Sequence, residues 1–241
     1  MQITNAVKKN ESKLIKSIQE LIQINSVKNA TPVTEDAPFG KGVKDSLLYI
    51  LKLGKEIGFQ TKLVDNVAGH IDFGSGEETI AVLGHVDVVP VTGDWIYPPF
   101  SGKLVDGKIY GRGALDDKGP VVCALYAMKV LKDIGFVPKK KIRLIIGTDE
   151  ESGMECMRRY AKLEKLPEVG FSPDASFPVI YGEKGIMSID LISNYVGDEI
   201  VSFSAGDRYN VVPDKAEALI KKKLAEEFMT DFQAHDLMWI V

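Results

Sequence analysis

TIAVLGHVD, from Thr79 to Asp87, is the stretch that decides the fold. Its first part, Thr79–Leu83, is a continuous apolar run, which is typical of a strand buried on both faces of a sheet. A second run of this kind, KIRLIIG at Lys141–Gly147, follows a predicted helix at Lys118–Ile134. Strand, helix and strand in this order predict an α/β domain with a mixed, largely parallel sheet flanked by helices.

The segments around these strands extend the pattern. Apolar residues recur at helical or alternating spacing, and they predict helices at Glu11–Ile24, Val43–Ile57 and Glu155–Leu163 and strands at Thr61–Val64 and Ala68–Phe73. Between the two buried strands, Val86–Asp106 is long, irregular and rich in Gly and Pro. Loops of this length in compact domains are usually functional or disordered.

The character of the sequence changes near residue 186. Strand-like patterns at Met187–Ile192 and Ile200–Ser204 precede an amphipathic pattern at Lys215–Gln233, which predicts a helix. We therefore predict one α/β domain over residues 1–186 and the beginning of a smaller α+β domain over residues 187–241.

Composition limits the classes of function. The chain has 241 residues, of which 45% are hydrophobic and 27% charged, as expected for a folded globular protein. A net charge of −4 and the lack of long like-charge runs argue against a nucleic-acid partner. No apolar stretch approaches the roughly 18 residues that cross a bilayer. We expect a cytoplasmic protein without membrane contact, in which Cys123 and Cys156 are reduced core residues.

Acidic residues and one histidine follow the ends of predicted strands. They stand after Thr79–Leu83, after Lys141–Gly147 and after the run at Glu168–Phe171, and two more precede the helix at Lys118. In open α/β sheets, ligands bind beyond the carboxyl ends of the strands. Imidazole and carboxylate groups at one sheet edge are typical of a divalent-metal site. The residues are His85, Asp87, Asp116, Asp117, Glu150, Glu151 and Asp174.

Taken singly, these residues also have ordinary structural explanations, and a lone histidine after a strand, such as His85, is often a polar core or surface residue. Asp116 or Asp117 would serve as the N-cap of the following helix. Glu150 and Glu151 would fit a solvated turn, and Asp174 follows a proline as turn residues often do. The recurrence of such groups at several strand ends favours a shared metal site over these separate explanations.

Four motifs carry a family resemblance. GHVDVVP (84–90), YGRGALDDKGP (110–120), GTDEESG (147–153) and SPDASFP (172–178) resemble, in order and spacing, motifs of the aminoacylase and carnosinase family of metallopeptidases. DDKGP, YGEKG (181–185) and FSAGDRYNVVPD (203–214) are most similar to the bacterial dipeptidase PepV branch. The resemblance covers nearly the whole chain. It implies a zinc-exopeptidase-like catalytic domain over residues 1–186 and the start of a lid domain over 187–241.

The resemblance also implies two divalent metal ions, with zinc expected and manganese or cobalt as alternatives. One ion would be bound by His85, Asp116 and Asp174. Asp116 would bridge to the second ion, which Glu151 also binds. A carboxylate can bridge because it has two oxygens and a negative charge that lets two dications lie close together.

Three further roles follow from the resemblance. Asp87 would hold the second imidazole nitrogen of His85 and so fix the tautomer of that ring. Glu150 would be the general base that takes a proton from water held between the metals. Asn210 would bind the free carboxylate of the dipeptide, although a turn residue at that position remains an alternative.

The implied function is a metal-dependent dipeptidase that hydrolyses unblocked dipeptides. An N-acyl-amino-acid deacylase of the same family is an alternative. The family takes its last metal-binding histidine from a later part of a longer chain, and neither His70 nor His235 matches it. We therefore expect the catalytic domain to be incomplete here, and a non-catalytic remnant is a third hypothesis. The sequence does not predict an oligomeric state.

Overall fold

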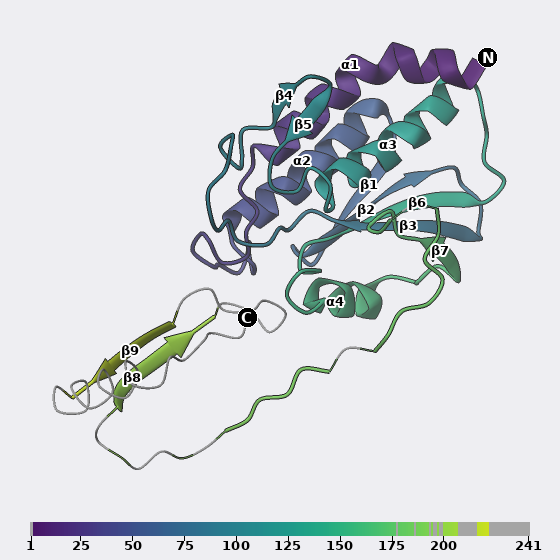
Figure 1. Cartoon of the computed structure of the whole chain (residues 1–241). Coiled ribbons are helices and arrows are strands. Elements are labelled where there is room, and N and C mark those ends of the chain that lie inside the picture. The colour runs from purple at the N-terminus through teal and green to yellow at the C-terminus, as the bar shows by residue number, and fades with distance from the viewer. Residues whose placement is uncertain are drawn as a thin grey trace. The chain divides into compact units, whose positions relative to one another are not determined.

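The computed structural model describes residues 2–176, 178–185, 187–192, 194, 197, 200–206 and 216–221 (Figure 1). The chain divides into two compact units, residues 1–180 and 181–241. The first unit contains the four motif segments up to Asp174. The domain boundary after residue 186, with its catalytic and lid parts, stays a prediction.

A five-stranded sheet forms the centre of the first unit, in the order β1-β2-β6-β3-β7. In chain order the strands are β1 Gln60–Val64, β2 Ala68–Phe73, β3 Thr79–His85, β6 Lys141–Gly147 and β7 Val169–Phe171. β3 lies parallel to β6 and β7, whereas the β1–β2 and β2–β6 pairs are antiparallel. The predicted α/β class with a mixed sheet is therefore confirmed. His85 is paired with Gly147, so β3 and β6 end level with each other.

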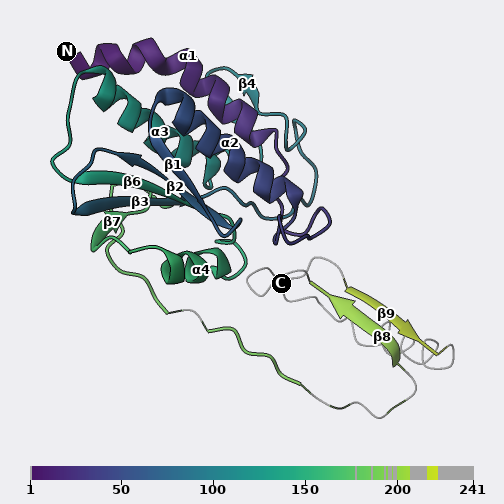
Figure 2. The same cartoon turned by 180° about the vertical axis from the view of Figure 1, so that it is seen from behind.

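Helices cover both faces of this sheet. Figures 1 and 2 show α1 (Gln2–Ile22), α2 (Lys41–Ile57) and α3 (Lys118–Asp133) on one face and α4 (Glu155–Leu163) on the other. The largest core cluster joins the first three helices to the sheet, and its fully buried members include Leu21, Leu47, Ile50, Leu125, Leu144 and Ile146. None of the helices in the described part of the chain is long and apolar enough to cross a membrane.

Helix α1 begins at Gln2, whereas the sequence predicted a start at Glu11. The added residues keep helical spacing, because Ile3, Val7 and the buried Asn10 follow one another at intervals of four and three residues and so lie on one face of the helix. The Asn10 amide donates hydrogen bonds to the Ala6 carbonyl and to a carboxylate oxygen of Asp133 at the end of α3. A polar tertiary contact of this kind leaves no apolar signal in the sequence.

Two short hairpins complete the described strands. Strand β4 (Lys103–Val105) pairs with β5 (Lys108–Tyr110), so the end of the predicted loop 86–106 contains a strand. In the second unit, β8 (Ile200–Ala205) pairs antiparallel with β9 (Ala216–Ile220). The strand predicted at Ile200–Ser204 is confirmed.

Two predictions for the second unit are wrong. The described residues of Met187–Ile192 form no strand. The helix predicted over Lys215–Gln233 is replaced at Ala216–Ile220 by strand β9, because backbone pairing with β8 overrides the helix propensity of AEALI. Lys221 is described and lies in no helix, and the remaining positions of that predicted helix, 215 and 222–233, lie outside the described residues.

The two cysteines differ in their surroundings. Cys156 is buried as predicted, whereas Cys123 is exposed on α3, where the prediction of a core residue was wrong. Cys123 lines an open apolar groove of about 770 Å³ that also involves Leu115 and Phe171. Because Cys123 lies in this open groove, its side chain is accessible.

Candidate metal centre

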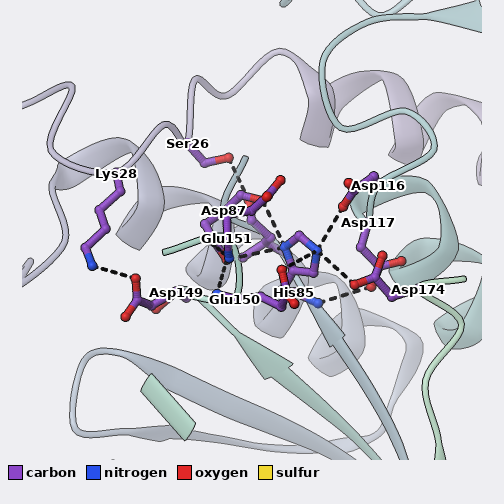
Figure 3. Close-up of polar contacts among 12 residues, drawn as sticks. Ser26, Lys28, His85, Asp87, Asp116, Asp117, Asp149, Glu150, Glu151 and Asp174 are labelled. Atoms are coloured by element: carbon purple, nitrogen blue, oxygen red, sulfur yellow. Dashed lines mark hydrogen bonds and ion pairs between the residues drawn. The ribbon is translucent and has the colours of Figure 1, made fainter. Parts of the chain in front are cut away.

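The sheet brings the predicted ligands to one edge. His85 is the last residue of β3, and the turn that carries Glu150 and Glu151 starts directly after β6, which ends beside His85. Asp116 precedes α3, and Asp174 follows β7, the other neighbour of β3. Figure 3 shows these side chains gathered around the His85 imidazole.

Three of the side chains meet closely enough to share an ion. One ligand atom each of His85, Asp116 and Asp174 lies within 4.8 Å of the other two. The His85 Nε2 atom is 3.0 Å from Asp116 Oδ1 and 3.3 Å from Asp174 Oδ2. Ligand atoms bound tetrahedrally at about 2.1 Å from a zinc ion lie about 3.4 Å from one another. The donor set and its spacing therefore fit a divalent metal ion.

Asp87 is fully buried and holds two parts of the site. Its backbone carbonyl lies 3.0 Å from His85 Nδ1, and its carboxylate Oδ1 lies 3.3 Å from the same nitrogen. The carboxylate also accepts hydrogen bonds at 3.2 Å from the backbone N–H groups of Glu150 and Glu151. Asp87 thus fixes the imidazole and, at the same time, the turn beside it.

The two adjacent glutamates occupy different positions. Glu150 Oε2 lies 3.9 Å from His85 Nε2. Glu150 also lines a pocket of about 130 Å³ together with Asp174 and apolar residues such as Met154 and Met157. Burial, followed by the negative charge of Asp116, raises the pKa of Glu151 to about 7. Among the described residues, Glu151 is not one of the three side chains whose ligand atoms meet within 4.8 Å.

Electrostatics favour a cation at this edge. Burial by itself lowers the pKa of His85, but the hydrogen bond and charge of Asp87 and the charge of Asp174 outweigh burial and raise it to about 10. Burial, with neighbouring carboxylates, raises the pKa of Glu150 and of Asp174. Several carboxylates held this close repel one another unless a positive charge lies between them. A divalent ion would relieve that repulsion.

Asp117 is not a helix cap, although the sequence allowed that explanation. It stands at the N-cap position of α3, but its side chain makes no capping hydrogen bond. Its carboxylate Oδ2 instead accepts the backbone N–H of His85 at 3.1 Å. Burial, with the charges of Asp174 and Asp116, raises the pKa of Asp117 to about 7.

Sequence reasoning missed three residues that support the site. The Ser26 hydroxyl donates to the carbonyl of Val86 at 2.6 Å, beside His85. Lys28 forms a 2.6 Å ion pair with Asp149, and the other Asp149 oxygen accepts the Glu155 N–H at 2.9 Å. Asp149 lies inside the GTDEESG motif, which offered a signal, whereas Ser26 and Lys28 lie in no recognised motif.

A buried lysine connects two helices behind the site. Lys118 at the start of α3 donates to the carbonyl of Leu21 in the last turn of α1 (3.0 Å) and to that of Ile24 just after the helix (2.7 Å). Burial lowers the pKa of its ammonium group to about 7. These contacts fix the start of α3, and with it the Asp116–Asp117 pair. Asn210, the predicted substrate-binding residue, lies outside the described residues.

Comparison with known families agrees with the fold. The model of peptidase family M20/M25/M40 matches residues 81–236, a range that includes every clustered side chain from His85 to Asp174. The chain belongs to this peptidase family. The resemblance to the aminoacylase and carnosinase metallopeptidases is thereby confirmed.

Two curated relatives are similar over most of this chain. The Bacillus subtilis protein named "Putative dipeptidase YtjP" is 46% identical over 226 residues, which cover 91% of this chain and 49% of that protein. A Staphylococcus epidermidis protein named "Putative dipeptidase" is 44% identical over 225 residues, which cover 90% of this chain and 48% of that protein. The chain thus spans about half the length of the curated relatives it matches.

Solved structures share the fold. Human carnosine dipeptidase 1 matches with a TM-score of 0.57 and 22% identity over 66% of this chain and 36% of that one. The di-peptidase Dug1p of Saccharomyces cerevisiae also matches with a TM-score of 0.57 and 22% identity, over 67% of this chain and 37% of that one. These likenesses show that the chain shares the fold of these proteins.

Proposed function

We propose that this chain carries the metal-binding part of a dipeptidase that hydrolyses the peptide bond of unblocked dipeptides. The observation that supports the proposal most strongly is the meeting of His85 Nε2 with the Asp116 and Asp174 carboxylates at 3.0 and 3.3 Å. The names of the curated relatives support the substrate class. A dipeptide is the proposed partner, and a cytoplasmic location stays a prediction.

Two divalent ions are the proposed cofactors. His85, Asp116 and Asp174 would hold one ion, and Asp116 and Glu151 would contribute to the second. Zinc is proposed first, and manganese and cobalt suit the same donor set. When bound, such ions lower the pKa of water towards about 7 and polarise a carbonyl group.

Glu150 is the proposed general base. Its carboxylate is partly exposed and borders the pocket next to His85, so it can reach a water molecule there. Burial raises its pKa above the usual value of a glutamate carboxyl, and a carboxylate with a raised pKa is a stronger base. Oε2 would take the proton from water and pass it to the leaving amine.

Asp87 and Asn210 complete the proposal. Asp87 would keep the proton on the Nδ1 side of His85, because the Asp87 carbonyl and carboxylate both face Nδ1. Nε2 is then left free as a metal ligand. Asn210 would bind the terminal carboxylate of the dipeptide, an assignment that comes from the motif resemblance.

The test combines metal titration with hydrolysis. A protein of the length of the curated relatives that includes this sequence is stripped with a chelator, supplied with Zn²⁺, Mn²⁺ or Co²⁺, and assayed on free dipeptides and on N-acetylated amino acids, beside the 241-residue chain alone. We expect metal-dependent hydrolysis of the dipeptides by the longer protein. Glu150→Gln should lower the rate by roughly 10²–10⁴-fold with metal affinity retained. Glu155→Gln, which removes a half-exposed glutamate paired with Arg158, is the matched control.

Other outcomes would separate the alternatives. Faster hydrolysis of the acetylated substrates than of the dipeptides would contradict the proposed dipeptidase activity and support the deacylase alternative. Tight metal binding without turnover would favour the non-catalytic remnant. Hydrolysis that survives metal removal would contradict the proposed chemistry altogether.

A further inference from the structure

The carboxylates of Asp116 and Asp117 are adjacent in sequence but serve different parts of His85. Asp116 is 62% exposed and faces the imidazole Nε2 atom. Asp117 is fully buried, and its Oδ2 atom accepts the backbone N–H of the same histidine at 3.1 Å. One aspartate thus contacts the ring of His85, and the other holds its main chain.

The end of β3 is shaped to admit the Asp117 carboxylate. A Cβ atom added to Gly84 would lie 2.5 Å from Asp117 Oδ2 and 2.5 Å from a methyl group of Val121. Real Cβ atoms do not approach other atoms so closely, so any larger residue at position 84 would displace Asp117 or α3. Gly84, the glycine of the GHVD motif, therefore allows α3 to approach β3 closely.

The second oxygen of Asp117 shows that stability alone does not explain this residue. Within the described part of the chain, Asp117 Oδ1 is buried without a hydrogen-bond partner. A buried polar atom without a partner destabilises a fold. Arrangements that are unfavourable for stability gather at functional sites, where geometry matters more.

We infer that Asp117 is a positioning residue, whose buried carboxylate fixes the main chain of His85 so that the imidazole meets the Asp116 and Asp174 carboxylates. The inference rests on the proposed metal site but not on the proposed hydrolysis. It assigns Asp117 a role distinct from that of a ligand and from that of a helix cap.

Two variants separate the hydrogen bond from the charge. Asp117→Asn keeps an oxygen that can accept the His85 N–H, whereas Asp117→Leu has a similar size and no acceptor. Co²⁺ is the probe, because its visible absorption spectrum reports the coordination geometry and its titration gives an affinity. Loss of partners that orient metal ligands typically lowers metal affinity about 10–100-fold. We expect a loss of that size, with an altered spectrum, for Asp117→Leu and near-parent behaviour for Asp117→Asn.

Asp72→Asn provides the matched control. Asp72 is a buried carboxylate on β2 that forms two 2.8 Å hydrogen bonds with Arg143, outside the metal centre. Its replacement should lower the melting temperature and leave Co²⁺ affinity unchanged. If Asp117→Leu does not fold, Asp117→Ala removes the acceptor with a smaller side chain.

Three results would overturn the inference. Equal losses of affinity in the Asn and Leu variants would show that Asp117 acts only through its charge. Unchanged affinity in the Leu variant would show that the hydrogen bond to His85 does not position the ring. A parent chain that binds no Co²⁺ would remove the proposed metal site, and this inference with it.

Discussion

Replacing Lys28 by Met should destabilise the first unit by about 2 kcal/mol, because the buried Asp149 carboxylate loses its cation. The Asp149 side chain is 1% exposed, and its Oδ1 lies 2.6 Å from Lys28 Nζ. Removing one partner of a fully buried pair costs about 3–5 kcal/mol. The cost should be smaller here, because the Lys28 side chain is 25% exposed and Asp149 keeps the Glu155 N–H as a donor.

Thermal and urea unfolding, followed by circular dichroism, measure this loss. For a unit of this size, about 2 kcal/mol corresponds to a melting temperature lower by about 4–8 °C. Lys52→Met is the matched control, since Lys52 and Glu56 form a 3.7 Å pair with side chains 76% and 59% exposed. Exposed helical pairs contribute about 0.3–0.5 kcal/mol. Equal changes in the two variants would refute the view that burial makes the Lys28–Asp149 pair important.

Three further predictions concern the core, the pH response and the metal. Leu144→Ala should cost about 2–5 kcal/mol of unfolding free energy, because Leu144 is fully buried in the central strand β6; urea unfolding measures it, with the exposed Leu104→Ala as control. Burial lowers the pKa of His70, so the unfolded chain binds the proton more readily and stability is lost as the pH falls below about 6.5. His70→Asn, which retains a partner for the Tyr160 hydroxyl, should lose less stability than the parent between about pH 7 and pH 5. Asp174→Asn should weaken Zn²⁺ binding at least about 10-fold in a calorimetric titration, since a direct ligand matters no less than its supporting partners.

Each of these has an outcome that would contradict it. A Leu144 variant no less stable than the Leu104 control would show that the core beneath α3 is not closely packed. Parallel pH curves for the parent and the His70 variant would show that the histidine titrates normally in the folded chain. Unchanged Zn²⁺ affinity in the Asp174 variant would exclude that carboxylate as a ligand.

The sequence predicted the central elements well where burial leaves a periodic signal. The apolar runs at Thr79–Leu83 and Lys141–Gly147 became the adjacent parallel strands β3 and β6. The first turns of α1 were not predicted, because a polar contact of Asn10 stabilises them. Strand β9 was not predicted, because its formation depends on pairing with β8. Interactions between distant segments override local propensity in both cases.

In the candidate site, too, sequence patterns predict some features, whereas contacts between distant segments decide others. The family resemblance implied that His85, Asp116 and Asp174 bind one ion, which stays a prediction; in the structure one ligand atom of each lies within 4.8 Å of the others. The supporting contacts of Ser26 and Lys28 could not be predicted, because they depend on how the chain after α1 packs against the ends of β3 and β6. Hydrogen-bond partners that hold a site in place leave little trace in a single sequence.

A crystal structure of the chain with Zn²⁺, using anomalous scattering at the zinc edge, would show directly whether distant side chains hold a divalent ion at the end of β3. We expect an anomalous peak about 2.0–2.2 Å from His85 Nε2 and from one carboxylate oxygen each of Asp116 and Asp174. Density at that edge without an anomalous peak, or zinc bound only at other residues, would contradict this expectation.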